Sequence, residues 1–169
     1  MHELRLFELP EEFIWQECRT IQALVPKPKL WPFIAEYKGK TRTYTFVKNQ
    51  APKGELATGL TLTALKEMAT SISSRVPFDT VPIITLESLP NLTAEGNMII
   101  ESNGPFLIAR RLFNNKNNEA QTKIYTEVTS NLETGTGYIL TFVAPEKDWG
   151  IDGPIGEFMI DNRFLSPNY

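Results

Sequence analysis

The chain has 169 residues, of which 41% are apolar and 22% are charged, proportions typical of a folded globular protein. Its formal net charge is −3, with 17 basic and 20 acidic side chains. Nucleic-acid-binding surfaces concentrate basic residues, so we expect no nucleic acid partner. No apolar run approaches the roughly 20 residues that span a bilayer, so we expect no transmembrane segment.

The start of the chain leaves the compartment open. Residues 1–13 carry too many charges for a secretory signal, so we expect a cytoplasmic protein, or an extracytoplasmic one if a leader was removed. Cys18 is the single cysteine, which excludes an internal disulfide. We expect it to be a semi-buried structural thiol.

Alternating apolar and polar side chains predict strands along much of the chain. The expected strands are 33–37 and 42–47, joined as a hairpin through Gly39, then 58–64, 106–113, 122–129 and 138–143. An asparagine-rich loop is expected at 114–118. Large side chains on both faces of 138–143 predict a central strand covered on both sides. Together these segments predict an antiparallel sheet of about five to seven strands.

Helices are expected at two places before the last strand. The helical spacing of Leu65, Met68, Ala69 and Ile72 predicts a helix at 64–73. Residues 80–89 allow two alternatives. They form a helix capped by Asp79 with Pro82 in its first turn, or a strand favoured by their Val-Ile-Ile content.

A C-terminal helix in two pieces is also expected. Pro145 opens its first turn, and Pro154 begins the second piece after a bend at Gly150 and Gly153. The expected apolar stripe consists of Ile155, Phe158 and Met159. The order of elements predicts an α+β domain in which helices cover an antiparallel sheet.

The inventory of side chains excludes several kinds of catalytic site. His2 is the only histidine and lies at a chain end, which removes Ser-His-Asp and Cys-His triads and histidine-rich zinc sites. Asp148 and Asp152 have calcium-loop spacing, but Gly150 and Met159 occupy two positions that need oxygen ligands. These carboxylates are therefore expected either to cap a helix or to form a weak cation site. We expect no catalytic residue, no metal and no cofactor.

Two groups of residues remain candidates for a site. Asp79, Glu95, Glu101 and Glu127 supply carboxylates for acid–base work on a sugar, although a solvated surface role is the default. Trp31 and Trp149 are candidate binding residues, because each is expected to be partly exposed beside a proline or a glycine.

Several separated segments resemble one family. They are Ala23-Leu24-Val25-Pro26 leading to Trp31, the threonine-glycine-leucine strand at 57–62, and 134–142 followed by Ala144-Pro145-Glu146 and Trp149. The pattern is similar to the PsbP-like superfamily, which includes the photosystem II extrinsic protein PsbP, a Ran-binding nuclear-import factor and related bacterial proteins. It covers about residues 24–165. The resemblance implies an α/β/α sandwich with a mainly antiparallel central sheet, formed by a single domain at 21–169. Residues 1–20 are then an N-terminal extension or an added strand.

Two hypotheses about function follow. The resemblance implies a non-catalytic, protein-binding or scaffold module with a protein partner, which would present a coherent exposed apolar patch. The alternative is a small-molecule or carbohydrate-binding protein, possibly a hydrolase with a carboxylate pair, which would place two acids in one concave pocket. Neither hypothesis specifies the partner or the oligomeric state.

Overall fold

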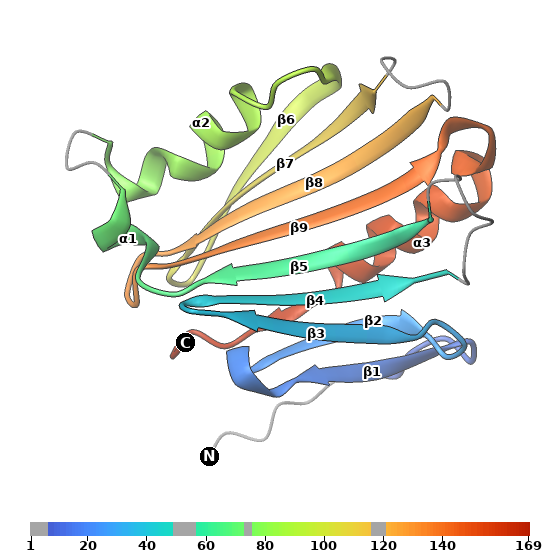
Figure 1. The fold of residues 1–169 in the computed structure, drawn as a ribbon, viewed down its shortest axis with the longest axis horizontal. Coiled ribbons are helices and arrows are strands. Elements are labelled where there is room, and N and C mark those ends of the chain that lie inside the picture. Colours follow the sequence, from blue (N-terminus) through green and yellow to red (C-terminus); the bar gives the residue numbers. More distant parts are fainter. Residues whose placement is uncertain (1–6, 49–56, 73–75, 116–120) are drawn as a thin grey trace.

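A seven-stranded antiparallel sheet forms the centre of the protein (Figure 1). The computed structural model describes residues 7–48, 57–72, 76–115 and 121–169. The strand order is β3-β4-β5-β9-β8-β7-β6. The bounds are β3 Phe33–Lys38, β4 Thr41–Val47, β5 Gly59–Leu65, β6 Thr93–Asn103, β7 Phe106–Asn115, β8 Thr122–Asn131 and β9 Thr136–Pro145. The predicted antiparallel sheet is confirmed, and β6 is the strand that the sequence did not predict. Residues 116–118 of the expected asparagine loop lie outside the described residues.

A second, three-stranded sheet has the order β1-β2-β10. Its strands are β1 (Phe13–Cys18), β2 (Ala23–Pro28) and β10 (Phe164–Leu165), and a 3₁₀ turn, η1 (Arg19–Ile21), joins β1 to β2. β10 pairs only with Ala23 and Leu24. The rest of β2 has no partner strand on that side among the described residues, and a strand tolerates proline at such an edge.

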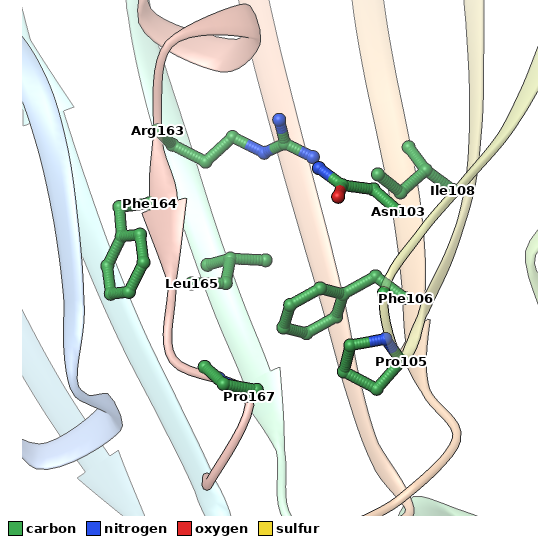
Figure 2. A pocket seen from close by; sticks show the side chains of 9 residues that line it. Asn103, Pro105, Phe106, Ile108, Arg163, Phe164, Leu165 and Pro167 are labelled. Atoms are coloured by element: carbon green, nitrogen blue, oxygen red, sulfur yellow. The ribbon is translucent and has the colours of Figure 1, made fainter. Parts of the chain in front are cut away.

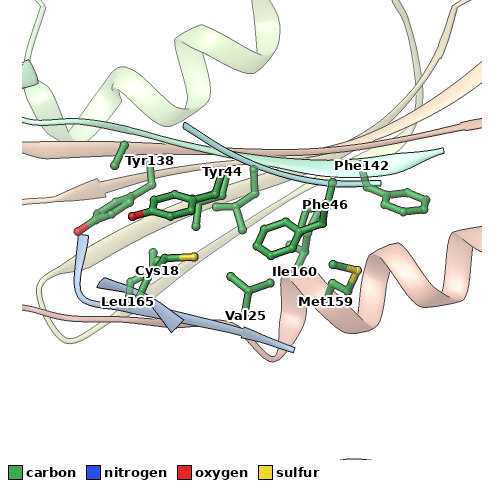
Figure 3. Packing of buried hydrophobic residues seen from close by; sticks show 14 of the residues in the cluster. Cys18, Val25, Tyr44, Phe46, Tyr138, Phe142, Met159, Ile160 and Leu165 are labelled. Atoms are coloured by element: carbon green, nitrogen blue, oxygen red, sulfur yellow. The ribbon is translucent and has the colours of Figure 1, made fainter. Parts of the chain in front are cut away.

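The elements form three layers (Figures 1 and 3). One face of the large sheet carries α3 (Trp149–Asp161) and the small sheet. The other face carries α1 (Met68–Ser71) and α2 (Val81–Glu87). The 3₁₀ turns η2 (Phe78–Thr80) and η3 (Glu146–Asp148) lead into α2 and α3. The structure confirms an α+β fold built as an α/β/α sandwich, with the small sheet added to the α3 layer.

The main core lies between the large sheet and the α3 layer (Figure 3). Alternate residues of the strands point into it, including Phe46 of β4, Leu62 of β5 and Phe142 of β9, all fully buried. A smaller cluster under α2 contains Leu86 and Val128, and Ile139 of β9 packs against it. β9 therefore contributes side chains to both cores, as predicted for residues 138–143.

The helix predicted at 64–73 is much shorter in the structure. Ala64 and Leu65 belong to β5, and α1 is a single turn, Met68–Ser71. Residue 73 lies outside the described residues. Gly137 of β9 lacks the side chain that would overlap Met68 Sδ, so the turn packs directly on the sheet. At 80–89 the helix alternative is confirmed and the strand alternative is wrong. Thr80, not Asp79, is the N-cap residue.

The C-terminal helix differs from the expectation in its bend. The break falls between η3 and α3, and α3 continues through Gly150, Gly153 and Pro154. Gly153 and Gly156 instead allow close packing. A Cβ at Gly153 would lie 2.7 Å from the Trp149 ring, and one at Gly156 would overlap the Phe142 ring. Gly156 therefore lets α3 lie close to β9, and Gly153 leaves room for the Trp149 ring of the same helix.

Candidate binding surface

Four exposed apolar side chains lie within residues 30–37, on and just before the outermost strand of the large sheet. They are Leu30, Phe33, Ile34 and Tyr37, with exposed fractions of 88%, 40%, 60% and 55%. We name them the β3 patch. Phe33 and Tyr37 face the same side of β3, and Ile34 lies on the opposite face, because successive side chains of a strand alternate. Exposed apolar side chains that share a face are typical of interaction sites.

A groove separates β3 from β1 and lies beside the β3 patch. Its volume is about 360 Å³, and its walls come from both sheets. It is lined by Gln16, Glu17, Arg19, Phe33, Ala35, Tyr37 and Tyr44. The Tyr44 hydroxyl lies 2.6 Å from Thr20 Oγ1 and 3.4 Å from the Tyr37 hydroxyl. Burial raises the pKa of Tyr44 to about 12, because removal from water disfavours the charged phenolate.

Lys27 holds the turn that presents Leu30. Its Nζ donates to the carbonyl oxygen of Trp31 at 2.6 Å and to those of Pro28 and Lys29 at 3.3 Å each. Burial lowers the pKa of Lys27, because removal from water disfavours the ammonium. Three carbonyls thus fix the turn while Leu30 stays in solvent.

The two tryptophans have different environments. Trp31 is only 6% exposed and stacks on Phe142, with ring centroids 6.4 Å apart, so its expected exposure is wrong. It still lines a shallow depression with Leu30 and Pro28. Trp149 is partly buried, and its ring lies edge-on to Phe142 at 5.9 Å. Both indoles pack against one core phenylalanine, and their contact with a ligand stays a prediction.

Two of the candidate carboxylates, Glu127 and Glu101, form ion pairs with Arg110 of β7. Glu127 is fully buried, with Arg110 Nε at 2.7 Å, an Arg163 terminal nitrogen at 2.8 Å and Thr129 Oγ1 at 2.9 Å. The default surface role is therefore wrong for Glu127. Glu101 also contacts Arg110, at 3.0 Å.

The other two carboxylates lie elsewhere. Glu95 lies 3.0 Å from Lys123 Nζ, and Asp79 lies in the η2 turn. None of the four carboxylates lines the β3 groove, the depression beside Leu30 or the hollow in Figure 2.

The hollow in Figure 2 lies between the β6–β7 turn and the segment that contains β10. Its volume is about 230 Å³. The Arg163 side chain extends across one end, with Asn103 pointing toward it, and Phe106 and Leu165 form apolar walls (Figure 2). Because Arg163 already pairs with Glu127, this guanidinium has a structural role that joins the end of α3 to β8.

The residues with calcium-loop spacing serve the fold. Asp152 is buried, and its carboxylate lies 2.6 Å from Lys48 Nζ and 3.5 Å from Thr58 Oγ1. Asp148 is the N-cap residue of α3, but its side chain makes no capping hydrogen bond there. Within the described ranges, no three His, Cys, Asp or Glu side chains gather in a way that could hold a metal ion. No helix in these ranges is long and apolar enough to cross a membrane.

Comparison by sequence with known protein families and with curated proteins gives no match. Comparison by structure shows the fold of the PsbP-like and Mog1 proteins. LpqN of Mycobacterium tuberculosis, described as involved in cell envelope biogenesis, matches with a TM-score of 0.59 and 12% identity, over 92% of this chain and 91% of LpqN.

Two further solved structures share the fold. The cyanobacterial PsbP protein of Synechocystis matches with a TM-score of 0.55 and 11% identity, over 95% of this chain and 99% of its own. The Ran-binding protein Mog1p of Saccharomyces cerevisiae matches with a TM-score of 0.52 and 11% identity, over 90% of this chain and 95% of Mog1p. These structures confirm the resemblance at the level of the fold.

The sequence pointed to neither Leu30 nor Ile34 as a surface residue. A signal was present, because Phe33 and Ile34 are adjacent and apolar, so one of them must face away from the core in a strand. In the structure both are exposed, since β3 lies at the edge of the sheet.

Proposed function

We propose that this protein is a non-catalytic, protein-binding module whose docking surface is the β3 patch and the groove beside it. The observation that carries the proposal is the exposure of two aromatic side chains, Phe33 and Tyr37, on the groove face of β3, with the exposed Leu30 just before the strand. Most exposed apolar side chains on a soluble protein are scattered singly. Tyr37 is also an exposed aromatic side chain, and such residues dominate binding energies when a partner removes them from water.

The shared fold gives supporting analogy. Mog1p, which has this fold, is described as Ran-binding, so the architecture is compatible with a protein partner. A fold hosts many functions, so the partner of this chain is not carried over from Mog1p.

The alternative, a small-molecule or carbohydrate-binding protein with a hydrolytic carboxylate pair, has less support. Glu101 and Glu127 do converge, but both face Arg110 at 3.0 Å and 2.7 Å. A general acid needs a raised pKa and access to the substrate. Glu127 has neither an exposed surface nor a place in the hollow of Figure 2.

A photo-crosslinking amino acid at residue 30 tests the proposal in the organism that makes the protein. Ile151 of α3 is the matched control position, because it is 75% exposed compared with 88% for Leu30. We expect a discrete crosslinked protein from position 30 and none from position 151. The crosslink should weaken when Tyr37→Ser is added. Equal crosslinking from both positions, or none from position 30, would contradict the proposal.

A further inference from the structure

One side of β3 has no partner strand among the described residues. β3 ends the large sheet, and β4 is its one neighbour among the described strands. The Val47 N–H donates to the Pro32 carbonyl oxygen at 3.1 Å, which makes this pair a hydrogen-bonded pair of the ladder. Such pairs recur at every second residue of an antiparallel ladder. The even-numbered residues of β3 therefore bond to β4, and the backbone groups of Phe33, Ala35 and Tyr37 point away from it.

The opposite edge of the sheet is less suited to accept a strand. β6 has a register shift between Glu95 and Ile99, next to Gly96 at φ +71°. A bulge of this kind bends an edge strand and protects it from pairing. By contrast, β3 stays in continuous register with β4 from Phe33 to Lys38. Of the two edges of the large sheet, β3 is thus the regular one.

The residues of β3 whose backbone groups point away from β4 are the same residues whose side chains face the groove. Phe33, Ala35 and Tyr37 line the groove toward β1, and the same three residues carry the outward N–H and C=O groups. A guest strand that bonded to them would place every second side chain over the groove. On the other face, Glu36 and Lys38 are exposed, and neither forms an ion pair within the described residues.

We propose that the partner binds as an extended segment that adds an antiparallel strand to β3. Its groove-facing residues are apolar, and its other face carries a basic residue opposite Glu36 and an acidic residue opposite Lys38. Apolar residues complement Phe33 and Tyr37, and opposite charges directly across a ladder stabilise pairing while like charges oppose it. This proposal rests on the proposed function and specifies its partner.

A peptide with the central sequence Asp-Val-Lys-Val-Thr-Val has this pattern. In antiparallel pairing, its aspartate lies opposite Lys38, its lysine opposite Glu36 and its second valine opposite Ala35. Amide hydrogen exchange by NMR should slow at Phe33, Ala35 and Tyr37 when the peptide is added. The amides of β6 provide the internal control and should not change. Equal protection on both edges, or protection on neither, would overturn strand addition at β3.

Two blocking changes make the test specific. Ala35→Pro removes one outward N–H at a position where an edge strand tolerates proline, and we expect about a tenfold or greater loss of peptide affinity. Ala35→Ser is the matched control and should retain binding. N-methylation of the second valine of the peptide should block binding even if Ala35→Pro does not fold. N-methylation of the lysine, whose N–H points away from β3, should not.

A charge exchange tests the register. Glu36→Lys should weaken the peptide by about threefold, and replacing the peptide lysine by glutamate should restore the affinity. A peptide shifted by one residue, which places its charges in the groove, should bind most weakly. If the shifted peptide binds equally well, the proposed pairing is wrong.

The outcomes separate the two proposals. If crosslinking at residue 30 identifies a partner whose binding depends on Tyr37 but not on the Ala35 N–H, the proposed function stands and strand addition is overturned. If sedimentation shows a dimer that Ala35→Pro dissociates, the added strand comes from a second copy of the chain, and a different partner at this edge is excluded.

Discussion

Arg110 Nε lies 2.7 Å from the buried carboxylate of Glu127, and Arg163 contacts the same carboxylate at 2.8 Å. One acidic residue of β8 therefore pairs with a guanidinium from β7 and with another from the segment after α3. The arrangement links the edge half of the sheet to the end of α3. Its loss should affect stability more than any exposed ion pair in the protein.

Glu127→Gln should destabilise the protein by about 3–5 kcal/mol, because it removes the one fully buried carboxylate that Arg110 and Arg163 share. Urea unfolding followed by tryptophan fluorescence measures the change. Glu101→Gln is the control, since Glu101 contacts Arg110 but its side chain is 51% exposed. It should cost less than about 1 kcal/mol. Similar losses for the two variants would show that the buried pair is not special.

Gly156→Ala should destabilise the fold by about 1–3 kcal/mol, because its Cβ would overlap the Phe142 ring in a packed interface. Gly150→Ala in the same helix meets nothing within 4 Å. This control should be neutral or stabilising by up to about 1 kcal/mol, since alanine favours the helix. Thermal unfolding of the two variants gives the comparison, and a stable Gly156→Ala protein would refute the close approach of α3 to β9.

Alkaline pH should destabilise the protein through its buried tyrosines. Burial raises the pKa of Tyr44 and of Tyr125 to about 12. The folded state therefore holds protons that the unfolded state releases near pH 10. This stabilisation is complete below pH 10 and is lost as the pH rises from about 10 to 12.

Tyr44→Phe should make the fall in stability between pH 10 and 12 less steep. It should also lower stability at pH 8, by about 1 kcal/mol, because the hydrogen bond with Thr20 is lost. Urea titrations at several pH values measure both effects. An unchanged alkaline slope would show that the Tyr44 hydroxyl does not retain its proton in the fold.

Cys18 should react with thiol reagents only when the protein unfolds. The side chain is fully buried, and burial, together with the nearby charge of Glu17, raises its pKa to about 12. Because the thiolate is the reactive form, labelling at pH 7.5 should be slow and should accelerate in urea. A cysteine at exposed position 151, in a Cys18→Ser background, is the control. Equal labelling rates at the two positions would contradict the burial of Cys18.

The sequence predicted best those elements whose side chains alternate between core and solvent. β5 is an example, because Leu60, Leu62 and Ala64 are all fully buried on one face. β6 was not predicted, since most of Thr93–Asn103 is exposed and its large apolar residues, Met98, Ile99 and Ile100, are consecutive and do not alternate with polar ones. The length of the α1 helix was also wrong. Local spacing cannot show that pairing with Thr41 and Arg42 keeps Leu65 and Ala64 in a strand.

The candidate site was only partly predictable for a similar reason. Trp31 was expected to be partly exposed, but its side chain is only 6% exposed, whereas that of the neighbouring Leu30 is 88% exposed. Hydrogen bonds from Lys27 Nζ to three carbonyl oxygens hold this turn in place. No sequence motif predicts these hydrogen bonds. Whether β3 is an edge strand or an inner strand depends on the order of strands in the sheet. The periodicity of apolar residues along the sequence does not reveal that order.

The most direct test of the account is the affinity of the crosslinked partner for two double variants. Phe33→Ser with Tyr37→Ser removes the aromatic side chains of the β3 patch, while Ile84→Ser with Ile151→Ser removes two exposed apolar residues from the helices. We predict that the first variant loses affinity by at least about a hundredfold, as for paired aromatic anchors, and that the second binds like the unaltered protein. Equal affinities of the two variants would show that the partner binds elsewhere.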